Sequence, residues 1–420
     1  MTQTMTDPAP LTLVHTSDWH LGHELSGHAR EAEHDAFLSW LLDQLEEQQA
    51  DVLLVAGDIY DVANPPVSAM RRLYAFLAAV SRRCPALQTV IVGGNHDSAA
   101  RIDLPAPLLD PKRVRFLGQL PRKAAEGGGT EPDLEALMVP LLRSDGETAA
   151  WLAAVPFCRP GDLGAHDLSS LYKCVADHAA ASAGDLPLVL SGHLHVAGGA
   201  VSELSERRIV VGGEEAQATS LFDGRAAYVA LGHLHRAQTI SGPCPIRYSG
   251  SPFPLSATER EYRHSISVVE LSAGQAARVR EVPIPRPVAF IAVPPQGAAP
   301  LDEVVAAIEA IDLDPALPRE RHPFIEVTAA VDGPEPHLQS RILVALADKP
   351  VRLTRIVRQT VIKEQASTTA MAGTDLGELK PEDVFAALHA ARYAGSPPSD
   401  DLAAAFARLL VEVNTAGEQA

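Results

Sequence analysis

Residues 90–97 read Val90-Ile91-Val92-Gly93-Gly94-Asn95-His96-Asp97, and this stretch decides the predicted fold. Its first part is apolar and β-branched, which is typical of a buried strand in an α/β sheet, and the two glycines allow a sharp turn. Three side chains that can bind metal or move protons follow the turn. In open α/β sheets, ligands bind in the crevice beyond the carboxyl ends of the strands. We therefore expect a functional site here if other strands end in the same way.

Four further apolar runs end in a similar manner, at residues 11–16, 51–56, 186–190 and 227–231. The metal-competent side chains that follow them are Asp18, His20, Asp58, His193, His233 and His235. An amphipathic helix predicted at 31–49 lies between the first two strands, so they form a βαβ unit and a parallel sheet is expected. Each strand end alone is a weak signal, but five in this order do not arise readily by chance.

With Asn95, these ends supply seven oxygen or imidazole donors and no thiolate. Such a set suits Mn or Fe better than Ca and differs from a closed structural zinc site. Seven ligands are too many for one ion but fit two, if one carboxylate is shared. Two ions roughly 3.5–4 Å apart can clamp a phosphate, generate hydroxide and stabilise the leaving oxygen. The predicted reaction class is phosphoester hydrolysis.

Composition limits the setting of this chemistry. A chain of 420 residues is expected to form two or three domains. The net charge of -18 argues against a broadly basic surface, so nucleic acid would have to meet local patches, metal ions or a partner. The four cysteines are scattered along the sequence, and we interpret them as reduced thiols of a cytosolic protein. No signal peptide or bilayer-spanning run is recognised, so a cytoplasmic protein with no membrane partner is expected.

Six segments carry a resemblance to a known family: His15–Gly22, Ala56–Asp61, Gly93–Asp97, Pro156–Pro160, Ala230–His235 and Tyr248–Pro252. Their order resembles the calcineurin-like metallophosphoesterase superfamily and, within it, the branch of SbcD-type nuclease subunits that work with an SbcC ATPase. The resemblance implies an α/β fold, namely a metallophosphoesterase β-sandwich flanked by helices. A small α+β capping domain and a C-terminal helical pair are expected to follow.

The resemblance also assigns roles to the site residues. One metal ion would take Asp18, His20, Asp58 and His235, and the other would take Asp58, Asn95, His193 and His233. Two divalent ions, expected to be Mn(II), are implied. His96 would contact the scissile phosphate and protonate the leaving 3′-oxygen, which suits an imidazole that titrates near working pH. Asp97 would stand behind the site and orient a neighbouring histidine.

One position departs from the family pattern. Archaeal and eukaryotic relatives carry a further histidine three residues past the bridging aspartate, where this chain has Asp61. An acid cannot clamp a phosphate as a cation does, so only an orienting role is expected for it. His195 has no metal role in this scheme and is expected at the rim of the site or on the surface. Three more histidines are expected on the surface near the mouth: His23, His28 and His34.

The predicted domains are residues 1–282 for the nuclease, 283–364 for the α+β DNA cap, and 365–420 for a linker and helical ATPase-binding region. The last cap strand carries the basic residues Arg352, Arg355, Arg358 and, just after it, Lys363. They indicate either an edge strand kept soluble by charge or a surface that contacts the DNA backbone.

Two C-terminal helices are predicted, at 381–393 and 402–413. Their apolar positions include Phe385, Leu388, Leu402, Phe406, Leu409 and Leu410. An apolar stripe on a tethered helical pair needs a partner to cover it. The resemblance indicates the base of the SbcC coiled coil, and docking back onto the chain's own core is the alternative.

The leading hypothesis is a Mn-dependent DNA nuclease of an ATP-dependent complex in DNA repair, recombination and replication. It would act as a 3′–5′ double-strand exonuclease and as a single-strand and hairpin endonuclease. A homodimer associated with the nucleoid is expected. A phosphatase or phosphodiesterase of the same fold is the second hypothesis, although phosphoprotein phosphatases usually have Arg where this chain has Val62. A non-enzymatic scaffold that tethers DNA ends is the third.

Overall fold

The computed structural model describes residues 9–125, 128–164, 166–202, 216–333, 335–360, 381–393 and 397–417. The chain divides into two compact units, residues 1–361 and 362–420, and each is described by itself. Lys363 and the predicted linker lie outside the described residues.

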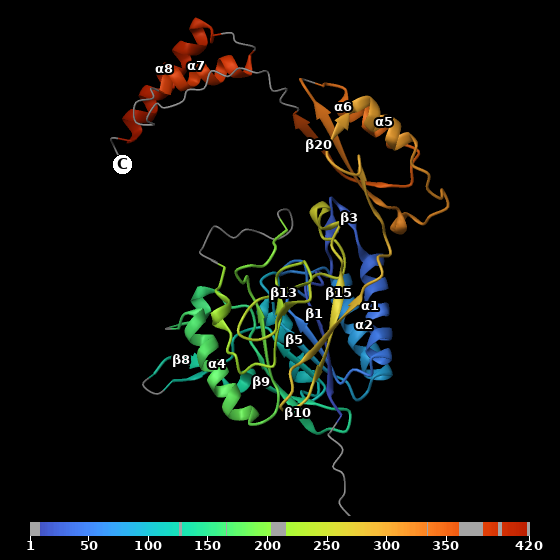
Figure 1. The fold of residues 1–420 in the computed structure, drawn as a ribbon, viewed down its shortest axis with the longest axis vertical. Coiled ribbons are helices and arrows are strands. Elements are labelled where there is room, and N and C mark those ends of the chain that lie inside the picture. Colours follow the sequence, from blue (N-terminus) through green and yellow to red (C-terminus); the bar gives the residue numbers. More distant parts are fainter. Residues whose placement is uncertain are drawn as a thin grey trace, which may run out of the picture. The chain divides into compact units, whose positions relative to one another are not determined.

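Two six-stranded sheets form the body of the first unit (Figure 1). The first has the order β16 (Arg278–Pro283), β15 (Ser265–Leu271), β1 (Leu11–Thr16), β4 (Val52–Ala56), β5 (Gln88–Val92) and β6 (Val114–Leu117). The second has the order β13 (Gln238–Ile240), β14 (Ile246–Tyr248), β12 (Tyr228–Gly232), β11 (Leu188–His193), β10 (Thr148–Ala154) and β9 (Met138–Leu142). The central strands of each sheet run parallel, as predicted. Antiparallel strands lie at both edges of the second sheet and at the β16 edge of the first, whereas β6 at its other edge is parallel to β5.

Apolar side chains between the sheets make the sandwich core, among them Leu13, Leu54, Val90, Leu152 and Val189, all fully buried. Helices α1 (Glu31–Glu47) and α2 (Val67–Arg83) cover the outer face of the first sheet, and α4 (Leu168–Ala183) covers the second (Figure 1). The predicted sandwich flanked by helices is confirmed. The α4 helix was not predicted, nor was the hairpin of β7 (Arg122–Ala124) and β8 (Thr130–Pro132).

The cap is a four-stranded parallel sheet covered by two helices. Its elements are β17 (Phe290–Val293), β18 (Ala299–Pro300), α5 (Leu301–Glu309), β19 (Phe324–Val331), α6 (Leu338–Leu346) and β20 (Arg352–Thr360). Its own core packs the helices on the sheet. The β20 strand pairs with β19 at one edge of this sheet.

An aromatic and arginine cluster joins the cap to the sandwich. The guanidinium of Arg30 lies 4.5 Å from the ring centre of Phe253 in the sandwich and 5.1 Å from that of Phe324 in the cap. Arg30 is buried and its charge is paired with Glu33. Arg352 packs 3.8 Å from the ring centre of Phe324. Such cation–π contacts strengthen when water is excluded, so this cluster fixes the cap against the sandwich.

The second unit contains α7 (Pro381–Arg392) and α8 (Asp400–Gly417). The rings of Phe385 and Phe406 stack at 4.1 Å and hold the two helices together. Leu388, Leu402 and Leu409 remain exposed within this unit. The side chain of Leu410 lies outside the described residues. Among the described helices, none is both long and apolar enough to cross a membrane.

Candidate active site

The site forms where strand ends of both sheets meet, because β4 packs against β11 and β12. Four of its residues adopt positive φ: Asp18 (53°), His20 (45°), Asp58 (48°) and His233 (102°). This conformation is costly for residues other than glycine and is concentrated at functional sites. Backbone hydrogen bonds from Asp18 to Gly57 and from His20 to Asp58, each 3.0 Å, hold the turns in place. The backbone is therefore strained at the residues whose side chains form the site.

Gly57 lets the two sheets approach closely enough for the site to form. Its φ is +93°, and a Cβ at this position would lie 2.1 Å from Nδ1 of His193. The His193 Nδ1–H in turn donates to the Ala56 carbonyl oxygen at 3.0 Å. A side chain at residue 57 would occupy the place of the His193 ring.

One group of possible ligands is Asp18, His20 and His235, whose donor atoms lie within 4.8 Å of one another. Both ring nitrogens of His20 are buried, and no described residue forms a hydrogen bond with either of them. The Nε2 atom lies 3.5 Å from Oδ2 of Asp58. Because Nδ1 faces the Asp61 carboxylate, Nε2 is the nitrogen that is placed to meet a cation.

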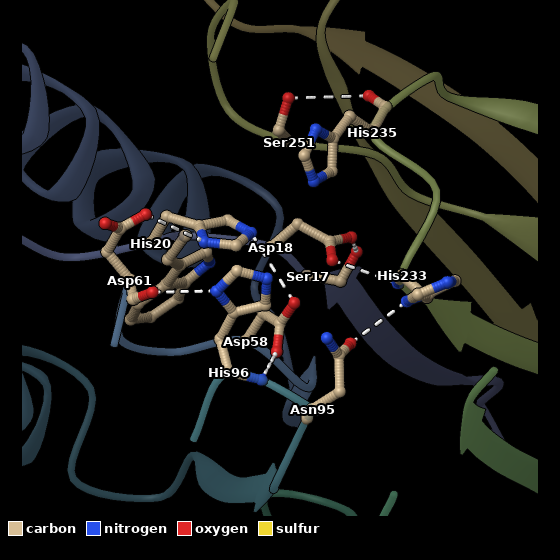
Figure 2. A network of polar contacts seen from close by, with 12 residues as sticks. Ser17, Asp18, His20, Asp58, Asp61, Asn95, His96, His233, His235 and Ser251 are labelled. Atoms are coloured by element: carbon tan, nitrogen blue, oxygen red, sulfur yellow. Dashed lines mark hydrogen bonds and ion pairs between the residues drawn. The ribbon is translucent and has the colours of Figure 1, made fainter. Parts of the chain in front are cut away.

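A second group surrounds the other side of Asp58 (Figure 2). The Asn95 side-chain oxygen lies 2.9 Å from His193 Nε2 and 3.0 Å from His233 Nδ1. His193 Nε2 also lies 3.3 Å from Oδ2 of Asp58. The same carboxylate oxygen thus faces His20 and His193, one from each group. If two ions were bound, Asp58 would be the residue placed to contribute to both.

The charges at the site depend on one another. Burial opposes ionisation of Asp58, but the imidazoles of His193 and His20 hold its pKa well below the ordinary value. Burial likewise opposes a charge on His193, yet the Asp58 carboxylate raises the pKa of His193 to about 9. Burial raises the pKa of Asp18. Before any ion binds, a proton on His193 supplies part of the positive charge that these carboxylates require.

The residues present fit divalent metal ions. The donors are carboxylate, amide and imidazole groups, they are buried or half-buried, and they converge from five strand ends. The seven predicted ligands lie around one site. Among the described residues, three groups have donor atoms that lie within 4.8 Å of one another: Asp18, His20 and His235; Asp18, Asp58 and His193; and His20, Asp58 and His96. The division into two sets of ligands that the resemblance implies stays a prediction.

His96 lies against the Asp58 carboxylate. Its backbone N–H donates to Asp58 Oδ1 at 2.8 Å, and its ring Nδ1 donates to the Asp61 carbonyl oxygen at 2.7 Å. The tautomer is thereby set, and the remaining nitrogen, Nε2, points away from Asp61 (Figure 2). Burial lowers the pKa of His96. The Asp61 carboxylate lies 3.3 Å from Nδ1 of His20. Asp61 therefore contacts the His96 ring through its backbone carbonyl and the His20 ring through its side chain.

Asp97 supports the backbone of two strand ends. Its carboxylate accepts hydrogen bonds from the backbone N–H groups of Gly94, Ile59 and Tyr60 at 2.9–3.1 Å. Burial and the nearby Asp58 charge raise the pKa of Asp97 to about 6. The residue was expected to orient a histidine ring; in the structure it orients main-chain turns instead.

Sequence reasoning missed Glu259, which is fully buried behind the site. It follows the Tyr248–Pro252 segment by a few residues, and neither its spacing nor its neighbours mark it. His34 was expected on the surface but is buried, with Nε2 3.0 Å from the Trp19 carbonyl oxygen. His195 is half-buried at the edge of the site, its ring 6.4 Å from that of His233.

Comparison with known proteins places the chain in a family. Residues 11–237 match the family model of the calcineurin-like phosphoesterases, and residues 285–393 match a model described as the type 5 capsule protein repressor C-terminal domain. The SbcCD nuclease D subunit of Rhodobacter capsulatus is 41% identical over 90% of this chain and 94% of its own length. The protein of the same name from Escherichia coli K12 is 30% identical, over 89% of this chain and 92% of its length. The Bacillus subtilis protein is 32% identical over 65% of this chain and 69% of its own length. The chain is therefore a calcineurin-like phosphoesterase and belongs, within that group, to the family of SbcCD nuclease D subunits.

Proposed function

We propose that the chain is a DNA nuclease that hydrolyses phosphodiesters with two bound Mn(II) ions. The observation that carries this proposal is the shared oxygen of Asp58, which lies within 3.5 Å of imidazoles from both ligand groups. Asp18, His20, Asp58 and His235 would hold one ion, and Asp58, Asn95, His193 and His233 the other. When bound, the two ions supply positive charge for the phosphate and make hydroxide available at neutral pH.

His96 provides the acid–base function in this proposal. Because its Nδ1 is held by the Asp61 carbonyl oxygen, its Nε2 is the atom left to contact the phosphate or the leaving 3′-oxygen. The lowered pKa keeps the ring neutral when the site is free. A phosphate brought alongside adds negative charge, which favours protonation and prepares the ring to give a proton to the leaving oxygen. Asp97 keeps the His96 turn in place through its bonds to the backbone.

The cap and the helical pair supply the macromolecular contacts. Arg358 is exposed and forms no ion pair with any described residue, which suits a contact with the DNA backbone. Arg355 pairs with Glu326, and Arg352 is buried in the junction with the sandwich, so these two contribute less. The exposed leucines of α7 and α8 offer an apolar surface to an SbcC-type ATPase.

The named relatives support this assignment, since they are nuclease subunits of SbcCD. We therefore extend it to cleavage of double-strand ends from the 3′ side and opening of hairpins and single strands. A cytoplasmic homodimer associated with the nucleoid is part of the same proposal.

The test is His96→Ala, assayed on an end-labelled duplex with Mn, Mg or EDTA and with or without the ATPase partner. The variant should bind two Mn(II) ions and lose cleavage, because the ligands are intact and the proton donor is absent. His178→Ala is the matched control, since that histidine is on α4 and pairs with Glu135. Normal DNA cleavage by His96→Ala would refute the assignment. Phosphopeptides and cyclic nucleotides in the same panel test a non-DNA substrate, and the absence of any Mn-stimulated turnover would favour a tethering scaffold.

A further inference from the structure

Glu259 stands directly behind one of the possible metal ligands. It ends a short 3₁₀ turn at Ala257–Glu259, and its side chain is fully buried. One carboxylate oxygen, Oε1, lies 2.8 Å from Nδ1 of His235. Full burial of a carboxylate is costly unless its charge is compensated, and the His235 imidazole is a polar group placed beside it.

The carboxylate is itself held in position. Its second oxygen, Oε2, accepts the backbone N–H of Leu255 at 2.7 Å. The two oxygens therefore have different partners, and Oε1 remains directed at the imidazole. An ionised carboxylate only accepts hydrogen bonds, so Nδ1 of His235 carries the hydrogen and Nε2 presents its lone pair to the site.

The other imidazoles of the site are supported differently. Nδ1 of His193 faces the neutral carbonyl of Ala56, and Nδ1 of His96 faces the neutral carbonyl of Asp61. Nδ1 of His20 lies 3.3 Å from a carboxylate that is partly open to solvent. Among the described residues, the His235 ring is the one backed by a fully buried carboxylate. A carboxylate behind a ligating imidazole fixes the ring and raises its basicity toward the metal.

We propose that Glu259 is a positioning residue that strengthens the metal site of Asp18, His20 and His235 selectively. The inference rests on the proposed two-metal centre and adds to it that the two ions are bound unequally. The ion beside His235 is the more firmly held, and the ion beside Asn95 is the more readily exchanged. Removing the Glu259 carboxylate should weaken the first and leave the second nearly unchanged.

The test is Mn(II) binding to the metal-stripped full chain, measured by calorimetry and by the EPR signal of free Mn(II), for wild type and Glu259→Gln. We expect two binding steps in the wild type and a roughly 10–100-fold loss of affinity in one of them in the variant. In Glu259→Gln the amide oxygen can still accept from His235, so this variant should bind better than Glu259→Ala. NMR of the imidazole nitrogens in the metal-free chain should show the Nδ1–H form of His235 in the wild type.

The control is Glu33→Gln, which also neutralises a buried carboxylate but one that is paired with Arg30 and contacts no ligand. That variant should lose stability and keep both Mn(II) affinities, which separates metal positioning from general destabilisation. Two unchanged binding steps in Glu259→Gln, or equal weakening of both, would overturn the inference. A wild-type chain that binds no Mn(II) would instead refute the proposed two-metal centre itself.

Discussion

Replacing Gly57 by alanine tests whether close approach of the two sheets is what assembles the site. The new methyl group would lie 2.1 Å from Nδ1 of His193, whereas ordinary contacts are about 3.5 Å. The ring would have to retreat by about 1.4 Å and give up its hydrogen bond to the Ala56 carbonyl. The positive φ of +93° adds about 1–2 kcal/mol of backbone strain for an L-residue.

A displacement of about 1 Å in a catalytic group can cost about 100-fold in rate, so Gly57→Ala should lose at least that much activity. It should also lose one Mn(II) binding step in calorimetry, because His193 is a candidate ligand of one ion. Gly274→Ala is the matched control: its φ is +67° and nothing lies within 4 Å of the added methyl group. Both variants should melt at a lower temperature, and only Gly57→Ala should lose the metal and the activity. If the two retained activity within about threefold of each other, the steric argument would be refuted.

Three further predictions follow from charges. The pKa of His193 is raised to about 9, and a metal ion needs the neutral ring, so Mn(II) affinity should fall as pH drops from 9 toward 7. Calorimetry should detect about one proton released for each pair of Mn(II) ions bound. An affinity that does not depend on pH would contradict this. The pKa of His34 is lowered by burial to about 4, so stability that is present above pH 6.5 should be lost as pH falls through 4, by up to about 3 kcal/mol. In urea unfolding with EDTA, the free energy of unfolding of His34→Gln should depend less steeply on pH than that of the wild type. An unchanged dependence on pH would count against the prediction. Arg358→Gln should reduce the slope of log DNA affinity against log salt concentration by about one unit. Arg352→Gln should lower stability and leave that slope unchanged. The reverse pattern would be inconsistent with the burial of Arg352.

The strands and the functional positions at their ends were predictable because they depend on local patterns, whereas the sandwich was expected from the family resemblance. Runs such as Val90–Val92 are apolar and are followed by a small residue, which indicates a strand and its end. Parallel pairing aligns the strand ends within each sheet, which places Asp18 near Asp58 and His193 near His233. Bringing Asp18 near His193 also requires the packing of the two sheets on each other. Their service as metal ligands remains a prediction.

Residues with long-range contacts were not predictable in the same way. Glu259 becomes significant only when the chain after β14 folds back on His235. Arg352 belongs to a basic strand, and only packing against Phe324 shows that its charge is buried rather than offered to DNA. His34 lies on a helix whose apolar stripe was recognised, but the Trp19 carbonyl that it faces comes from another segment.

The cluster at Arg30 has a consequence for the order in which the chain can fold as it is synthesised. Phe324, which closes the cluster, follows Arg30 by about 290 residues, and at about 5–20 residues per second it is added roughly 15–60 s later. During that interval the arginine and its Glu33 partner lack their aromatic cover from the cap. The sandwich therefore reaches its final packing only after the cap strand containing Phe324 has left the ribosome. A chain that stalls on the ribosome before that point would expose the Arg30 side of the sandwich, which the cap covers in the complete structure.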